Sequence, residues 1–341
     1  MMHETLFYLS VTAAFSFAFV NGMHDGGNVI ATIVCSRSMR AGRAMALAAL
    51  AEFLGPLVLG TAVATTMATS ILRPEALKTL SPEKLQLVVL SALIGAILWK
   101  VPSWFLGLPS SASHALVGGL VGAGYLAMGG AGIALHPIIV NVLVPLLLSP
   151  LLGFLVGALI FGTISVMFRG APRSVGQFFA SLQNVTAVIL AASQGTNDAP
   201  KTMGLVALLL AFRAGNVSSE IHLPQWVVLG CAGALALGLI MGGWRIVRTV
   251  GYGICRLEPV HSFASQFTAA SVVLGASVLG SPVSTTQIVS TSVMGVGAAR
   301  RISAVRWSTT AGIASAWFLT LPASALLSAG CYWCCTRLLS L

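Results

Sequence analysis

The sequence contains very little charge. Only 8% of its 341 residues are charged and 57% are hydrophobic, whereas a soluble domain typically carries about 25% charged residues. So few charged side chains could not cover the surface of a water-soluble fold of this size. The net charge of +10 does not indicate nucleic acid as a partner, because the Lys and Arg residues form no dense patch. The class of protein that remains is a helical protein that crosses the membrane several times.

Motifs of metal, redox and nucleotide chemistry are also missing. The six cysteines are scattered through apolar segments, and the CxxC spacing in Cys331-Tyr-Trp-Cys334-Cys335 has no second pair and no set of His residues beside it. The chain has no His-Glu-x-x-His motif and no Gly-rich phosphate loop in a soluble domain. We therefore expect no covalent cofactor, no zinc protease activity and no direct use of a nucleotide.

The two Asp residues reveal an internal duplication. Asp25 and Asp198 are separated by 173 positions, and each ends a similar tetrapeptide, Gly-Met-His-Asp or Gly-Thr-Asn-Asp. The same shift aligns the hydroxyl-rich segment after Pro109 with the one after Pro282. Three matches at one shift, counting a later Gly-x-Gly, are not expected by chance. The sequence therefore predicts two repeats, residues 1–170 and 174–341.

Each predicted repeat contains five apolar segments. They are 5–36, 44–70, 85–104, 110–128 and 136–168, then 176–213, 225–244, 259–280, 284–298 and 307–336. An odd number of crossings inverts the second repeat relative to the first. When the loops alternate between two sides, eleven basic residues lie on one side and five on the other, so the positive-inside rule places both termini outside the cytoplasm. We predict an all-α, multi-pass protein of the cell (plasma or inner) membrane, with about 10 to 12 transmembrane segments.

Several segments are not simple spans. Segments 5–36 and 176–213 are too long for one straight crossing at about 1.5 Å per residue, and glycines and polar residues interrupt both of them midway. The segments after Pro109 and Pro282 are short and begin with Ser or Thr. Inverted repeats with broken helices and re-entrant hairpins are typical of secondary transporters, whose site lies at the midplane between the repeats.

The polar residues at these interruptions can bind ions of both signs. An Asp within the membrane is functional by default, and carboxylate and amide oxygens suit a small cation or a proton relay. A helix that begins after a proline offers free N–H groups and a positive dipole end to an anion. The predicted residues for a coupling cation or proton are Asn21, His24, Asp25, Glu52, Asn197 and Asp198, and the hydroxyls predicted for an anion are Ser110, Ser111, Ser113, Ser284, Thr285 and Thr286.

Other interpretations stay open at this point. Lys201, one turn from Asp198, could simply neutralise it, and the Ser and Thr hydroxyls could only cap helices. Asp25 and Asp198 could also form the dyad of an intramembrane aspartyl protease, although such an enzyme needs no paired hydroxyl segments. A channel or scaffold is a third alternative.

The interrupted segments resemble the signatures of the inorganic phosphate transporter (PiT) family. The first is Asn21-Gly-Met-His-Asp-Gly-Gly-Asn28 and the second Gly195-Thr-Asn-Asp-Ala-Pro-Lys-Thr-Met-Gly204. The Pro-Ser-Ser-x-Ser-His and Pro-Val-Ser-Thr-Thr elements and Gly242-Gly-Trp-Arg245 are similar too. The resemblance covers nearly the whole chain. It implies uptake of an oxyanion coupled to Na⁺ or H⁺, by alternating access, in a homodimer in the lipid bilayer.

The resemblance also implies which residues hold the ions. Its anion site comprises the hydroxyls together with the motif residues, namely Asp25, Asn28, Ser110, Ser111, Ser113, Asn197, Asp198, Lys201, Ser284, Thr285 and Thr286. Na⁺ is possible at Asp25 and Asp198. The chain differs from the family at Gln194 and Gln287, where His is common, and at Gln266, where Glu is common.

Some members of the family carry sulfate, so the substrate needs a chemical argument. Phosphate near pH 7 still carries protons and sulfate carries none. An ionised Asp accepts a hydrogen bond from protonated phosphate but repels sulfate, and a missing donor can reduce binding by a factor of roughly 10⁴. Both motif Asp residues are present, so we expect phosphate, with sulfate as the alternative, and a transporter instead of an enzyme.

Overall fold

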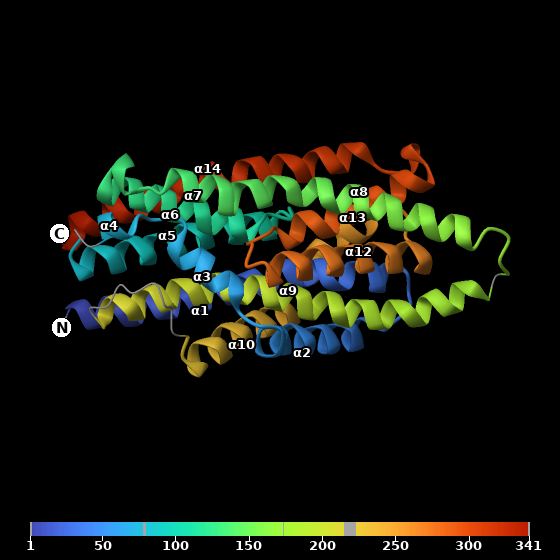
Figure 1. Cartoon of the computed structure of the whole chain (residues 1–341), viewed down its shortest axis with the longest axis horizontal. Helices are drawn as coiled ribbons and strands as arrows, with labels where there is room; N and C mark the ends of the chain where they lie inside the picture. Colours follow the sequence, from blue (N-terminus) through green and yellow to red (C-terminus); the bar gives the residue numbers. More distant parts are fainter. Residues whose placement is uncertain (1, 78–79, 173, 215–222, 340–341) are drawn as a thin grey trace.

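The computed structural model describes residues 2–77, 80–172, 174–214 and 223–339, and this part of the chain is almost entirely helical, without a β-strand. The first half contains α1 (Met2–Cys35), α2 (Ala41–Leu59), α3 (Ala62–Thr69), α4 (Pro74–Leu77), α5 (Pro82–Phe105), α6 (Ala112–Met128), α7 (Leu135–Ile138) and α8 (Val144–Met167). The second contains α9 (Val175–Arg213), α10 (Gln225–Gly242), α11 (Trp244–Val247), α12 (Pro259–Val278), α13 (Thr285–Arg300) and α14 (Trp307–Leu339). The all-α membrane architecture is confirmed (Figure 1).

Within the described residues, seven helices are long and apolar enough to cross a membrane, fewer than the 10 to 12 expected. They are α1, α2, α5, the run Leu135–Met167, α9, α10 and α14. The expected segments 110–128, 259–280 and 284–298 are not among the seven. They correspond to α6 and α13, which have only 17 and 16 residues, and to α12, whose 20 residues include His261, Gln266 and several Ser. The expected span 44–70 is divided at Gly60, which adopts a φ of +100°, and only its first part, α2, counts among the seven.

The expected breaks in segments 5–36 and 176–213 are wrong, because α1 and α9 are continuous helices of 34 and 39 residues. Their glycines allow close helix packing instead. A Cβ atom on Gly22 would collide with the backbone of Leu235 in α10, and one on Gly195 with the backbone of Glu52 in α2. At about 1.5 Å per residue the two helices are about 50 and 60 Å long, so both exceed the roughly 30 Å hydrocarbon core.

Two helical hairpins reach the centre of the molecule from opposite ends (Figure 1). Helices α5 and α6 form one hairpin, whose tip contains Pro109, and α12 and α13 form the other, whose tip contains Pro282. The tips meet, since the Ser113 hydroxyl donates a hydrogen bond of 3.0 Å to the Val283 carbonyl. Short helices therefore do follow the two prolines, as the sequence predicts.

Helix boundaries in the two halves correspond at the same shift of 173. The shift takes the first residue of α1 to that of α9, the first residue of α6 to that of α13, and the last residue of α5 to that of α12. The packing is reciprocal as well: α6 contacts α14 and α8 contacts α13, while α1 contacts α10 and α9 contacts α2. The N- and C-termini lie at the same end of the molecule (Figure 1).

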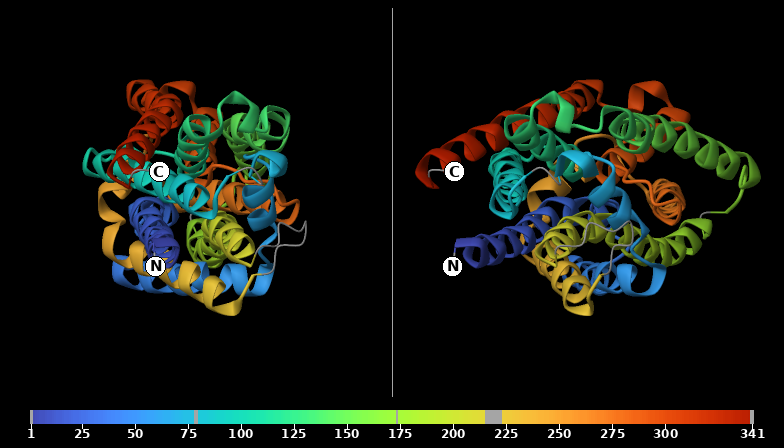
Figure 2. Two further views of the ribbon diagram at one scale, coloured as in Figure 1. Left: turned by 90° about the vertical axis from the view of Figure 1, so that its left-hand side faces the viewer. Right: turned by 60° about the vertical axis from the view of Figure 1, so that its left-hand side comes forward.

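The centre of the molecule is formed by α1 and α9, which lie side by side between the hairpins and the pair α2 and α10 (Figure 2). Residues 24–33 of α1 and 193–209 of α9 are buried on every side. A helix buried all round is normally apolar, yet both polar motifs lie in these stretches. The fold thus brings the two motifs to the point where the hairpin tips meet.

Candidate functional site

Asp25 lies in the buried part of α1 and contacts α13 and α5. The Thr286 hydroxyl donates a hydrogen bond of 2.6 Å to its Oδ1 atom, and the Asn28 amide donates one of 3.2 Å. Its Oδ2 atom lies 3.8 Å from the Lys100 ammonium. Short bonds to a carboxylate are charge-assisted and stronger than those between neutral groups. Asp25 therefore links its own helix to the start of α13.

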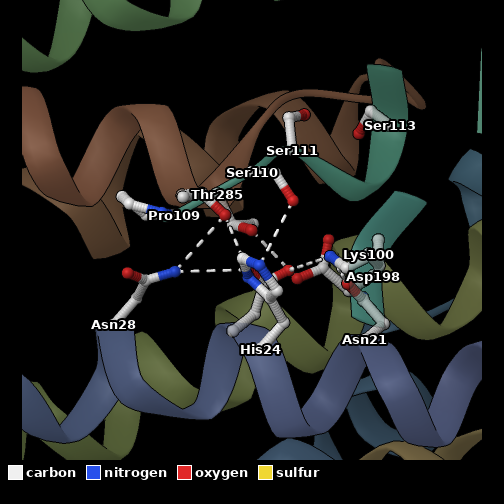
Figure 3. Close-up of polar contacts among 12 residues, drawn as sticks. Asn21, His24, Asn28, Lys100, Pro109, Ser110, Ser111, Ser113, Asp198 and Thr285 are labelled. Atoms are coloured by element: carbon white, nitrogen blue, oxygen red, sulfur yellow. Dashed lines mark hydrogen bonds and ion pairs between the residues drawn. The ribbon is translucent and has the colours of Figure 1, made fainter. Parts of the chain in front are cut away.

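Lys100 is a site residue that the sequence prediction missed. It is completely buried in α5, and its ammonium donates a hydrogen bond of 2.7 Å to Asn21 Oδ1 (Figure 3). The sequence did contain a signal, because a lone Lys deep in an apolar run meets the same criterion that selected Asp25. Counting charges only in the loops left it unnoticed.

His24 joins α1 to the tip of the first hairpin. Its Nε2 atom lies 3.2 Å from the Ser110 hydroxyl (Figure 3). The same Nε2 atom lies 3.3 Å from the Ser103 hydroxyl, and the two hydroxyls are 2.9 Å apart. Its Nδ1 atom is 3.7 Å from Asp25. Ser103 is a second residue that sequence reasoning missed. This network places Ser110 beside the Asp25 cluster.

Asp198 forms an equivalent cluster in the second half. Lys201 donates a hydrogen bond of 2.6 Å to its Oδ1 atom, and the Thr285 hydroxyl donates one of 3.0 Å to Oδ2. The same ammonium group also donates to the Val283 carbonyl at 2.9 Å. Lys201 therefore does neutralise Asp198, and it also fixes the tip of the second hairpin.

The predicted hydroxyls divide into three groups. Ser110, Thr285 and Thr286 contact His24, Asp198 and Asp25, as described above. Ser111 accepts a hydrogen bond from the His114 backbone N–H at 3.4 Å, and Ser284 accepts one from the Gln287 N–H at 3.3 Å, so both cap the helices that follow. Ser113 is occupied by the contact between the two tips.

Buried acceptor atoms remain without a hydrogen-bond partner in the described part of the chain. They include Asp25 Oδ2, Asn28 Oδ1, Asn197 Oδ1 and both carboxylate oxygens of Glu52. The Asn197 amide group donates to Ser277 and to the Ser281 carbonyl, which leaves its oxygen free. A buried acceptor without a partner costs about 1–3 kcal/mol. Such oxygens are suited to bind a cation or a proton, although no group of three or more His, Cys, Asp or Glu that could hold a metal occurs among the described residues.

Glu52 enters the site from α2. Its side chain is fully buried, and its backbone lies against Gly195, three residues before Asp198. Gln266 lies elsewhere, where it accepts a hydrogen bond from Thr186 and donates one to Thr32. The change at Gln266 therefore does not alter the direct contacts of either Asp.

Comparisons with known proteins identify the family. The model of the family described as "Phosphate transporter family" matches residues 21–328. A "Probable low-affinity inorganic phosphate transporter" of Rhizobium meliloti (strain 1021) is 42% identical, over 95% of this chain and 94% of the relative. One of the same name from Bacillus subtilis (strain 168) is 36% identical, over 95% and 96%.

A solved structure is similar over almost its whole length. It is entitled "The sodium-dependent phosphate transporter", with a TM-score of 0.87 and 27% identity over 98% of this chain and 99% of that chain. The relatives are named as transporters, so the protease interpretation is wrong. The chain belongs to the phosphate transporter family and is a multi-pass membrane transporter, not an enzyme.

Proposed function

We propose that this chain takes up inorganic phosphate by symport with Na⁺ or H⁺, through alternating access to a central site. The observation that supports this best is that both motif carboxylates, Asp25 and Asp198, accept hydrogen bonds from neighbouring hydroxyls at the start of α13. A helix start with two hydroxyls is an anion site. The carboxylates beside it favour an anion that can donate a proton to them, as protonated phosphate can.

The proposed anion site lies at the hairpin tips. Ser110, Thr285 and Thr286 would exchange their present partners for phosphate oxygens, and Lys201 would contribute positive charge. The motif residues Asp25, Asn28, Asn197 and Asp198 would complete the site, with Ser111, Ser113 and Ser284 supporting the helix starts. Protonated phosphate can donate to an Asp, whereas sulfate cannot. Sulfate remains the alternative substrate.

The proposed coupling ion binds at the free oxygens. Asn21, His24, Asp25, Glu52, Asn197 and Asp198 are the candidate residues, with Na⁺ possible at Asp25 and Asp198. Buried oxygens without partners on Asn28, Asn197 and Glu52 support a binding role for a cation or proton. The coupling ion would bind together with the anion and reduce the net negative charge of the transported species.

Two inverted repeats, residues 1–170 and 174–341, provide the proposed mechanism. The shared helix boundaries at a shift of 173 and the reciprocal helix contacts support this division. Movement of one hairpin relative to the other would expose the site to each side in turn. We also propose that both termini lie outside the cytoplasm, on the basis of the distribution of basic residues between the loops. The family resemblance supports a homodimer.

The test is uptake of labelled phosphate into proteoliposomes by Asp25→Asn and Asp198→Asn. Both variants keep the side-chain volume and lose the charge, so we expect at least a tenfold loss of coupled uptake per reconstituted folded transporter. Each variant also leaves a buried Lys without its partner, so the Tm is measured alongside and uptake is compared at equal amounts of folded protein. Thr285→Ala should raise the KM for phosphate, and Thr291→Ala on the same helix is its control, because that hydroxyl bonds only to backbone carbonyls. Uptake at the wild-type rate by both Asn variants would refute the site.

A further inference from the structure

Two ammonium groups lie at the centre of the molecule, and each is next to one motif carboxylate. Lys201 is 2.6 Å from Asp198, and Lys100 is 3.8 Å from Asp25. Both lysines are at most 1% exposed. The charges of these four groups therefore cancel inside the protein. A buried charge without a partner is far more costly than a paired one, so neither carboxylate needs an additional cation to remain ionised.

The two lysines do not derive from equivalent positions of the proposed repeats. At a shift of 173, Lys100 corresponds to Val273, and Lys201 corresponds to Asn28. One cation comes from the helix of a hairpin and the other from the motif helix itself. In each half one ammonium group therefore neutralises one motif carboxylate, although the two lysines occupy different positions. This favours a role for the positive charge itself over a packing role inherited by both halves.

We propose that Lys100 and Lys201 are built-in counter-cations that replace sodium at Asp25 and Asp198, and that the coupling ion is a proton carried by Glu52. This inference rests on the proposed function, because it chooses between the two coupling ions left open there. The structural neighbour is named as sodium-dependent, so the proposal separates this chain from it in the ion used.

Glu52 is the carboxylate that no ammonium group accompanies. Both of its oxygens are buried and lack a hydrogen-bond partner among the described residues, and it takes part in no ion pair there. The helices packed against α2 are α1, α9 and α10. Near the site, α1 carries His24 and Asp25, α9 carries Asp198 and Lys201, and α10 has no charged residue. A proton neutralises Glu52 in this environment without the several oxygen ligands that a metal ion needs.

The first test measures sodium binding without measuring transport. A ligand that binds only the native state raises its Tm, so the Tm of the purified full chain is compared in NaCl and in choline chloride at equal ionic strength. We expect no difference for the wild-type protein and a saturable increase with Na⁺ for Lys100→Met, whose Asp25 has lost its counter-charge. Lys84→Met, in the first turn of the same helix, should behave like the wild-type protein, and Lys100→Arg, which keeps the positive charge, should gain no stabilisation by Na⁺.

Two results would overturn the proposal. One is a saturable Na⁺ stabilisation of the wild-type protein that Asp25→Asn removes, a comparison that stands even if Lys100→Met does not fold. The other is a folded Lys100→Met that binds phosphate more weakly but does not respond to Na⁺, since Lys100 would then be an anion ligand only.

The second test measures coupling in proteoliposomes with the membrane potential clamped. We expect an inward proton gradient to drive accumulation of labelled phosphate in Na⁺-free choline buffer, and Glu52→Gln to reduce this accumulation at least tenfold. Accumulation that requires a Na⁺ gradient refutes the inference and leaves the proposed function intact. Absence of phosphate uptake under every gradient refutes the proposed function itself, whatever the Na⁺ dependence of the Tm.

Discussion

Replacement of Gly195 by Ala tests whether the motif glycines allow the helices of the site to pack closely. The added Cβ atom would lie within 3.0 Å of the carbonyl oxygen, the carbonyl carbon and the Cα atom of Glu52. These are backbone atoms, so no side-chain rotation can relieve the collision. Helices α2 and α9 would have to separate by about 1 Å to restore van der Waals contact.

The expected magnitude combines two opposing contributions. In a helix interior, Ala is more favourable than Gly by roughly 0.5–1 kcal/mol, whereas overpacking of a tight contact costs about 1–3 kcal/mol. We therefore expect Gly195→Ala to destabilise the protein by about 1–2 kcal/mol. Because the displaced segment carries Glu52, we also expect phosphate uptake to fall.

Gly176, on the same helix, is the matched control. A Cβ atom there would have no neighbour within 4 Å, so Gly176→Ala should be neutral or slightly stabilising. The assay compares thermal unfolding of the purified variants in detergent and their phosphate uptake in proteoliposomes. If Gly195→Ala were as stable and as active as Gly176→Ala, the close-packing explanation would be wrong.

Three further predictions concern individual polar contacts. Thr286→Val removes the hydroxyl that donates to Asp25 at 2.6 Å and that would donate to phosphate in the proposed site; loss of a hydrogen bond to the charged anion, at about 1.5–3 kcal/mol, corresponds to a roughly 10- to 100-fold lower kcat/KM for phosphate uptake, and unchanged uptake would exclude Thr286 as an anion ligand. Lys201→Met leaves Asp198 without its ammonium partner and should lower the free energy of unfolding by about 3–5 kcal/mol. Addition of Asp198→Asn should recover most of that loss, and a Lys201→Met variant as stable as the wild-type protein would show that the ion pair is dispensable. Ser284→Ala removes the cap of α13 and should cost about 1 kcal/mol of stability while the KM for phosphate stays close to the wild-type value; a large rise in KM would make Ser284 a direct anion ligand.

Much of the architecture follows from the sequence because it depends on repeated, local features. The apolar runs are long enough to be recognised as helices, and the prolines at 109 and 282 lie between one helix and the next. The shift of 173 between Asp25 and Asp198 also relates the first residues of the helices that contain them. These features require no knowledge of which helices are neighbours.

The errors concern features that depend on tertiary contacts. The glycines of the two motifs indicate breaks when the sequence is considered alone, but Gly22 and Gly195 are sites of close approach to α10 and α2. Similarly, hydroxyls in one run have different partners: Ser111 caps its helix, whereas Ser110 reaches His24. Lys100 becomes part of the site only because α5 packs against α1.

The most direct test of the central claim is to locate the bound anion. Arsenate has the charge and protonation of phosphate, and it scatters X-rays anomalously. We predict one anomalous peak, at the arsenic atom, which places the arsenate oxygens within hydrogen-bond distance of Ser110, Thr285 and Thr286; excess phosphate removes this peak, and it is absent in Asp25→Asn. A peak displaced by phosphate but lying away from the two hairpin tips would contradict the site assigned to this transporter.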